Sequence, residues 1–123
     1  MIIAAVIVII LGLLAAFQIA LALGAPWGRL AWGGADRVLP AGRRVASLVA
    51  VLLYAAFAVI VLAAAGLIDL PPLLVEIGIW VVFAVFVLGI LANAASKSRR
   101  ERALMTPLNA VLAALTLLVA LGA

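Results

Sequence analysis

The stretch MIIAAVIVIILGLLAAFQIALAL, residues 1–23, decides the fold class, because it is long and contains no charged side chain. At about 1.5 Å of rise per residue, a helix of this length crosses a hydrocarbon core about 30 Å thick. The stretch lacks the basic start of a signal peptide, and its apolar run is longer than the apolar region of one. The sequence therefore predicts a first transmembrane helix here.

Three further apolar runs follow, and the chain of 123 residues is 72% hydrophobic and only 10% charged. A soluble domain is about one-quarter charged, so the bilayer is the expected solvent. We expect spans at about residues 1–23, 45–67, 73–95 and 106–122. Thr106 is expected to cap the last helix, with Pro107 at its first position. The predicted fold is all-α, an integral membrane four-helix bundle forming one domain, with up-down-up-down order and short loops.

All eight basic residues fall in two segments that connect spans. The first segment carries Arg29, Arg37, Arg43 and Arg44, and the second, SKSRRER at 96–102, carries Lys97, Arg99, Arg100 and Arg102. The connection IDLPP at 68–72 has no basic residue. Because basic loops remain in the cytoplasm, we expect both basic segments inside and both termini outside, in a multi-pass protein of the bacterial inner membrane.

The absence of Cys and His removes thiol nucleophiles, imidazole bases and the commonest soft-metal ligands. We therefore expect no catalytic residue, no cofactor and no metal site, and no enzymatic activity. Glu76 is expected in the first turn of its helix, where the helix dipole stabilises a carboxylate, although an intramembrane acid also fits a proton or ion pathway. The candidates for either helix contacts or a polar path are Gln18, Tyr54, Glu76, Asn93, Asn109 and Thr116.

A second group of residues is expected at the cytoplasmic membrane surface, where Trp lies among headgroups and basic side chains attract anionic lipid. The group comprises Trp27, Arg29, Trp32, Arg43, Arg44, Lys97, Arg99, Arg100 and Arg102. An alternative for the tryptophan segment is a re-entrant loop that binds lipid or a partner protein. The net charge of +4 is explained by this surface, so we expect no nucleic acid partner.

Two stretches, GAPWGRLAWGG at 24–34 and NAASKSRRERALMTP at 93–107, resemble signatures of small four-span bacterial membrane proteins. The resemblance implies the architecture above and implies no activity. Small multidrug transporters place a Glu in their first helix, and this chain has no acid there. Fluoride channels have four short spans, but their polar track has no counterpart that we identify in this sequence.

The two halves of the sequence form a weak parallel repeat, in which Gln18 and Asn93 occupy matching places near the end of a span. Any four-span protein with two basic loops would show a similar pattern, so the sequence does not decide whether the two halves are a true repeat. The small-residue spacings Ala46-xxx-Ala50 and Ala110-xxx-Ala114 indicate close helix contacts.

Four short helices enclose little interior, so we expect a homo-oligomer or a larger membrane complex. The leading functional hypothesis is a non-enzymatic accessory or interaction subunit, and the alternative is an oligomeric transporter or channel for a small solute or ion.

Overall fold

The computed structural model describes residues 1–122, and over this range the chain is helical without strands. The long helices are α1 (Ile2–Ala22), α2 (Ala41–Ala64), α3 (Pro72–Ala94) and α4 (Arg99–Ala120). Two short 3-10 turns, η1 (Gly28–Leu30) and η2 (Trp32–Gly34), lie between α1 and α2. Each long helix is sufficiently long and apolar to cross a membrane, so the chain is a multi-pass membrane protein and the predicted fold class is confirmed.

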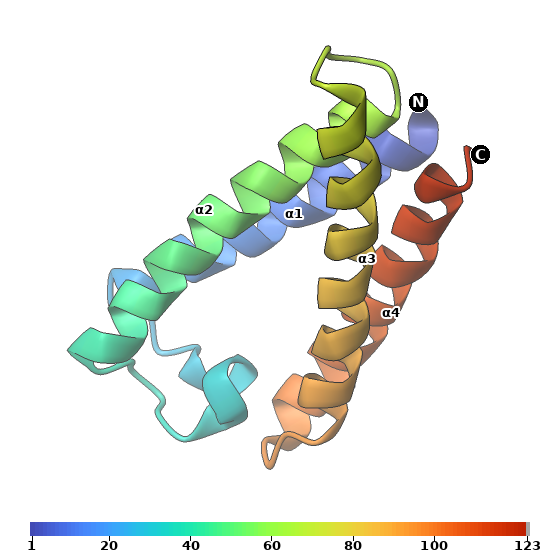
Figure 1. Cartoon of the computed structure of the whole chain (residues 1–123). Coiled ribbons are helices and arrows are strands. Elements are labelled where there is room, and N and C mark those ends of the chain that lie inside the picture. The colour runs from blue at the N-terminus through green and yellow to red at the C-terminus, as the bar shows by residue number, and fades with distance from the viewer. Residues whose placement is uncertain (123) are drawn as a thin grey trace.

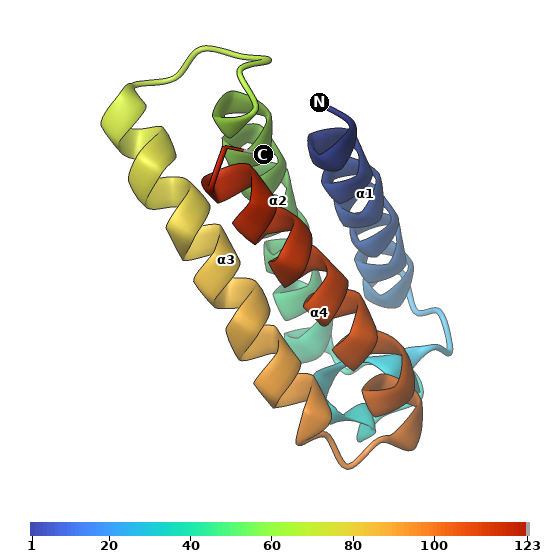
Figure 2. The same ribbon diagram turned by 90° about the vertical axis from the view of Figure 1, so that its right-hand side faces the viewer.

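The four helices pair as two antiparallel hairpins, α1 with α2 and α3 with α4 (Figure 1). Between the hairpins, α1 contacts α4 and α2 contacts α3. Both termini and the connection 65–71 lie at one end, which we call the terminal end, and Figure 2 shows the same grouping from the side. The opposite end holds the connection 23–40 and the turn 95–98. We call it the basic end, because all eight basic residues lie in these connections or in the first turns of α2 and α4.

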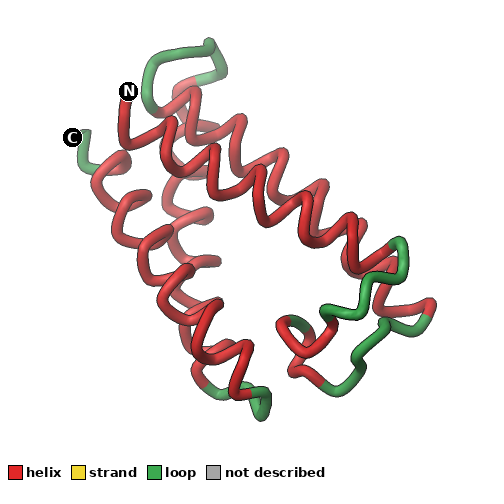
Figure 3. The backbone as a smooth tube through the Cα atoms, turned by 180° about the vertical axis from the view of Figure 1, so that it is seen from behind, coloured by secondary structure: helices red, strands yellow, loops and turns green. Residues whose placement is uncertain are grey.

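Packing differs between the two ends of the bundle. The main core lies toward the terminal end and consists of Ala4, Ile7, Leu11, Val61, Ile79, Val82, Phe86, Leu112, Ala113 and Val119. At the basic end a smaller cluster joins Leu21 of α1 to Ala31 and Leu39 of the first connection. The hairpins diverge toward this end, and the segment 23–40 lies in the opening between them (Figure 3).

Helix α4 begins about two turns earlier than expected, which corrects the prediction of an N-cap at Thr106. The cap is Ser98, whose hydroxyl accepts a hydrogen bond from the backbone N–H of Glu101 at 3.3 Å. A Ser followed three residues later by Glu is a capping-box pattern. The helix begins at this pattern and not at the Thr-Pro pattern. Pro107 lies inside the helix, and Thr106 is an ordinary helical residue. Most of the segment 96–102 is therefore helical and not a loop.

Two glycines bring neighbouring helices close together. A Cβ on Gly78 of α3 would lie 2.9 Å from the Ile60 side chain of α2, and one on Gly89 would lie 2.5 Å from the Asn109 amide oxygen of α4. Small residues allow such close packing in lipid, where no hydrophobic force joins helices. Within the chain, Ala114 is exposed and Ala113 is buried, so the expected Ala110-xxx-Ala114 contact faces away from the bundle.

Candidate functional site

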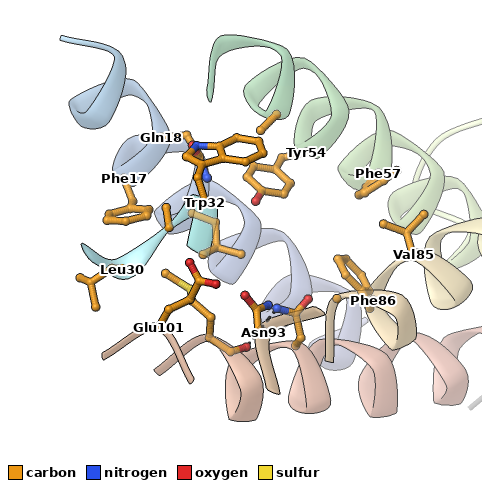
Figure 4. Close-up of a pocket in the computed structure, with 16 residues that line it drawn as sticks. Phe17, Gln18, Leu30, Trp32, Tyr54, Phe57, Val85, Phe86, Asn93 and Glu101 are labelled. Carbon is orange, nitrogen blue, oxygen red and sulfur yellow. Dashed lines mark hydrogen bonds between the residues drawn. The ribbon is translucent and has the colours of Figure 1, made fainter. Parts of the chain in front are cut away.

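The candidate site is a cavity of about 250 Å³ between the two hairpins, on the basic side of the main core. Its floor is formed by core residues such as Phe86, and its cover by Leu30 and Trp32 from the first connection (Figure 4). All four long helices contribute to the lining. The cavity exists because the hairpins are in close contact only over the terminal half.

Each long helix presents one uncharged polar side chain to this cavity: Gln18 from α1, Tyr54 from α2, Asn93 from α3 and Asn109 from α4. Gln18 is only 7% exposed, and its amide oxygen has no hydrogen-bond partner. The Asn109 amide donates to the carbonyl of Met105 at 3.0 Å, one turn earlier in α4. Four of the six predicted polar candidates thus meet at one place.

The fifth polar group is the carboxylate of Glu101, which belongs to the segment 96–102 that was expected to connect two spans. It lies in the first turn of α4 and is only 5% exposed. One carboxylate oxygen accepts the backbone N–H of Gly33 at 3.2 Å. The helix dipole also favours a negative charge in this turn. Glu101 is therefore the one ionisable acid among the lining residues of the cavity.

The first connection is fastened to both hairpins and so covers the cavity. Trp32 adopts a left-handed backbone conformation with φ 51°, and its indole N–H donates to the hydroxyl of Ser47 on α2 at 3.0 Å. On the other hairpin, the Ser98 hydroxyl donates to the carbonyl of Arg29. Gly34 lies against this contact, because a Cβ there would overlap the Ser98 side chain. Trp32 is thus part of the cover of the cavity, whereas Trp27 is 51% exposed and does not line it.

Several basic side chains bind backbone carbonyls outside the cavity. Arg29 donates to the carbonyl of Gly34 at 2.6 Å, Arg44 to that of Leu39 at 2.7 Å, and Arg102 to that of Ser96 at 2.7 Å. The Arg43 guanidinium lies 5.8 Å from the centre of the Trp32 ring. Lys97, Arg99 and Arg100 are exposed. No basic residue is found among the described residues that line the cavity.

Two of the predicted polar candidates lie elsewhere. Thr116 is fully buried near the main core, and its hydroxyl has no hydrogen-bond partner. Glu76 is exposed and borders a separate hollow at the terminal end. Glu76 is the fifth residue of α3 and lies just past the first turn, which holds no acidic residue, so the expected first-turn position is wrong by about one residue.

Glu101 is the site residue that sequence reasoning missed. Its signal was the Ser98-x-x-Glu101 spacing, which marks a helix start and removes Glu101 from the loop. Among residues 1–122, no group of three His, Cys, Asp or Glu side chains is placed to hold a metal ion. Comparison with protein-family models, with curated proteins and with solved structures finds no match to this chain.

Proposed function

We propose that this chain is a solute transporter of the bacterial inner membrane, in which the cavity between the hairpins is the solute site. The convergence of Gln18, Tyr54, Asn93 and Asn109 on one cavity carries the proposal. Polar side chains that only join neighbouring helices have no reason to face a common space. Binding sites in membrane transporters lie between helices near the middle of the bundle. This arrangement favours transport over the accessory role, which requires no cavity.

The clustering of all eight basic residues supports a cytoplasmic position for the basic end. Anionic headgroups on that side would bind the exposed Lys97, Arg99 and Arg100. With this orientation the cavity lies toward the cytoplasm, and the main core separates it from the outside. In the proposed carrier, the solute would reach the site from the cytoplasm through the opening between the hairpins, which the first connection covers.

Transport would require the two hairpins to rock against each other. Each hairpin is held together along its length, whereas the hairpins meet mainly through the core at the terminal end. Closing the basic end and opening the terminal end would expose the same side chains to the outside. Because most large apolar side chains outside the core face away from the bundle, a homo-oligomer would give the hairpins a fixed support.

Cysteine accessibility tests the proposal directly, since the chain contains no native cysteine. Ala50 lines the cavity, and its neighbour Val49 is exposed toward lipid, so Ala50→Cys and Val49→Cys form a matched pair. Each variant is treated with a small, charged, membrane-impermeant thiol reagent in inverted and in right-side-out vesicles. We expect Ala50→Cys to react rapidly in inverted vesicles and slowly in right-side-out vesicles, and Val49→Cys to react in neither.

Reaction of Ala50→Cys from the cytoplasmic side alone would support a binding cavity and overturn the transport step. Equal reactivity of Ala50→Cys and Val49→Cys would overturn the cavity itself. Faster reaction of Ala50→Cys in right-side-out vesicles would overturn the orientation.

A further inference from the structure

The charge inside the cavity is opposite in sign to that of the chain as a whole. The chain carries eight basic and four acidic residues. The described lining of the cavity contains Glu101 and no basic residue. A ligand that enters this space therefore meets one buried negative charge, and an anionic ligand would be repelled in a region of low dielectric.

The cavity also contains buried acceptors whose hydrogen bonds are incomplete. An ionised carboxylate accepts about four hydrogen bonds, and the structure gives Glu101 one donor at its side-chain oxygens, the Gly33 N–H. The buried amide oxygen of Gln18 has none. Buried acceptors almost always have partners in folded proteins. A ligand with N–H donors or a positive charge would supply such partners.

The rest of the lining includes most of the aromatic side chains of the chain. The chain has three Trp, one Tyr and four Phe residues. Five of these eight line the cavity: Phe17, Trp32, Tyr54, Phe57 and Phe86. Aromatic faces attract cations, and this attraction is strongest where water is excluded. A bare inorganic cation would leave these rings without contacts, whereas an alkyl or aryl body would fill the space between them.

The volume of the cavity is sufficient for a small organic ligand. The cavity holds about 250 Å³. A cavity of about 150 Å³ accommodates benzene, and pockets for drug-sized molecules begin at about 300 Å³. The space therefore fits a molecule with one ring, or with a short alkyl body, and one charged group.

We infer that the cavity binds a small organic ammonium ion, with Glu101 as its counter-ion and the aromatic residues around its apolar body. This inference rests on the proposed function, because it names the class of solute that the same cavity takes. Gln18 supplies a further acceptor for a ligand N–H group. Glu101 contacts the ligand directly and also keeps the Gly33 N–H bond that holds the cover.

Two probes of the same shape test the charge. Phenyltrimethylammonium is the cation, and tert-butylbenzene is its neutral counterpart, with carbon in place of nitrogen. In a chain carrying Trp27→Phe and Trp80→Phe, Trp32 is the only remaining tryptophan and reports on the cavity. We expect the cation to change Trp32 fluorescence with a saturable dependence on concentration, and choline or sodium to compete weakly or not at all.

The variant Glu101→Gln keeps an acceptor for Gly33 and removes the charge. We expect it to bind the cation about tenfold more weakly, which corresponds to about 1.4 kcal/mol, and to leave tert-butylbenzene binding unchanged. Glu76→Gln is the matched control, because it removes the same charge outside the cavity. Equal affinity of the wild type for the two probes, or equal cation binding by both variants, would overturn the inference.

A second measurement leaves Glu101 intact, in case Glu101→Gln does not fold. Phenyltrimethylammonium should protect Ala50→Cys from the thiol reagent in inverted vesicles, and tert-butylbenzene should not. If Ala50→Cys reacts rapidly in inverted vesicles and slowly in right-side-out vesicles but neither probe protects it, the cation assignment fails and the proposed function stands. If Ala50→Cys does not react at all, both the proposed function and the cation assignment fail.

Discussion

A single methyl group added at Gly34 should loosen the cover of the cavity, because the two hairpins are joined there by a contact with no room for a side chain. Gly34 has φ +72°, and a Cβ on it would lie 2.7 Å from the hydroxyl oxygen of Ser98. Neighbouring Gly33 has φ +77° and nothing within 4 Å of the same added atom. Gly33→Ala and Gly34→Ala therefore share the backbone strain and differ in the steric overlap.

The expected magnitudes follow from these contacts. An alanine in the left-handed region costs about 1–2 kcal/mol, and both variants carry this cost. In Gly34→Ala the first connection must also move away from α4, which breaks the hydrogen bond from Ser98 to the Arg29 carbonyl. That bond contributes about 1 kcal/mol, and a disturbed N-cap adds about 1 kcal/mol. We expect Gly34→Ala to be less stable than Gly33→Ala by about 2 kcal/mol.

The measurement is the free energy of unfolding in detergent, followed by Trp32 fluorescence in the single-tryptophan background. Combined with Ala50→Cys, Gly34→Ala should also raise the rate of thiol modification in inverted vesicles, and Gly33→Ala should not. Equal stability and equal thiol reactivity of the two glycine variants would show that the first connection is not held against α4. The description of the cavity cover would then be refuted.

The remaining predictions concern topology and buried polar groups. Lys97→Cys should be labelled by an impermeant thiol reagent only in inverted vesicles and Asp69→Cys only in intact cells, and the reverse pattern would contradict the orientation. Glu76→Gln should change the free energy of unfolding by less than about 0.5 kcal/mol, because the carboxylate is exposed; a larger loss would show a structural contact. Thr116→Val should stabilise the protein by about 1 kcal/mol, because it removes a buried hydroxyl without a partner, whereas Ser47→Ala should destabilise it by a similar amount, because the Trp32 indole loses its acceptor. Stability changes of the same sign in these two variants would contradict the assigned hydrogen bonds.

The helices themselves could be read from the sequence. In lipid every backbone N–H and C=O must be satisfied within its own segment, so a long apolar run becomes a helix almost without regard to its neighbours. The predicted spans accordingly match α1, α2 and α3 to within a few residues. The exception is the start of α4. The sequence offers two helix-start patterns there, Thr106-Pro107 and Ser98-x-x-Glu101, and the helix begins at the second.

The position of individual polar side chains could be predicted only in part. Gln18 and Asn93 occupy matching places in the two halves of the sequence, and the structure brings both to the same cavity. Thr116 looked equally suitable and lies in the packed interior. Sequence spacing along one helix indicates its faces, but lipid is as apolar as the core, so an apolar helix carries little information about which face its neighbours cover.

The sequence alone determined that this protein has four membrane helices and that its basic residues gather at one end, because both properties depend on local hydropathy and charge. The tertiary structure decided that Glu101 is buried, through a bond from Gly33 that joins residues far apart in the chain. It also decided that one polar side chain from each helix faces a common cavity under Trp32. These features depend on how two hairpins diverge and on where a loop fits between them, and such long-range shape is not encoded in any single segment.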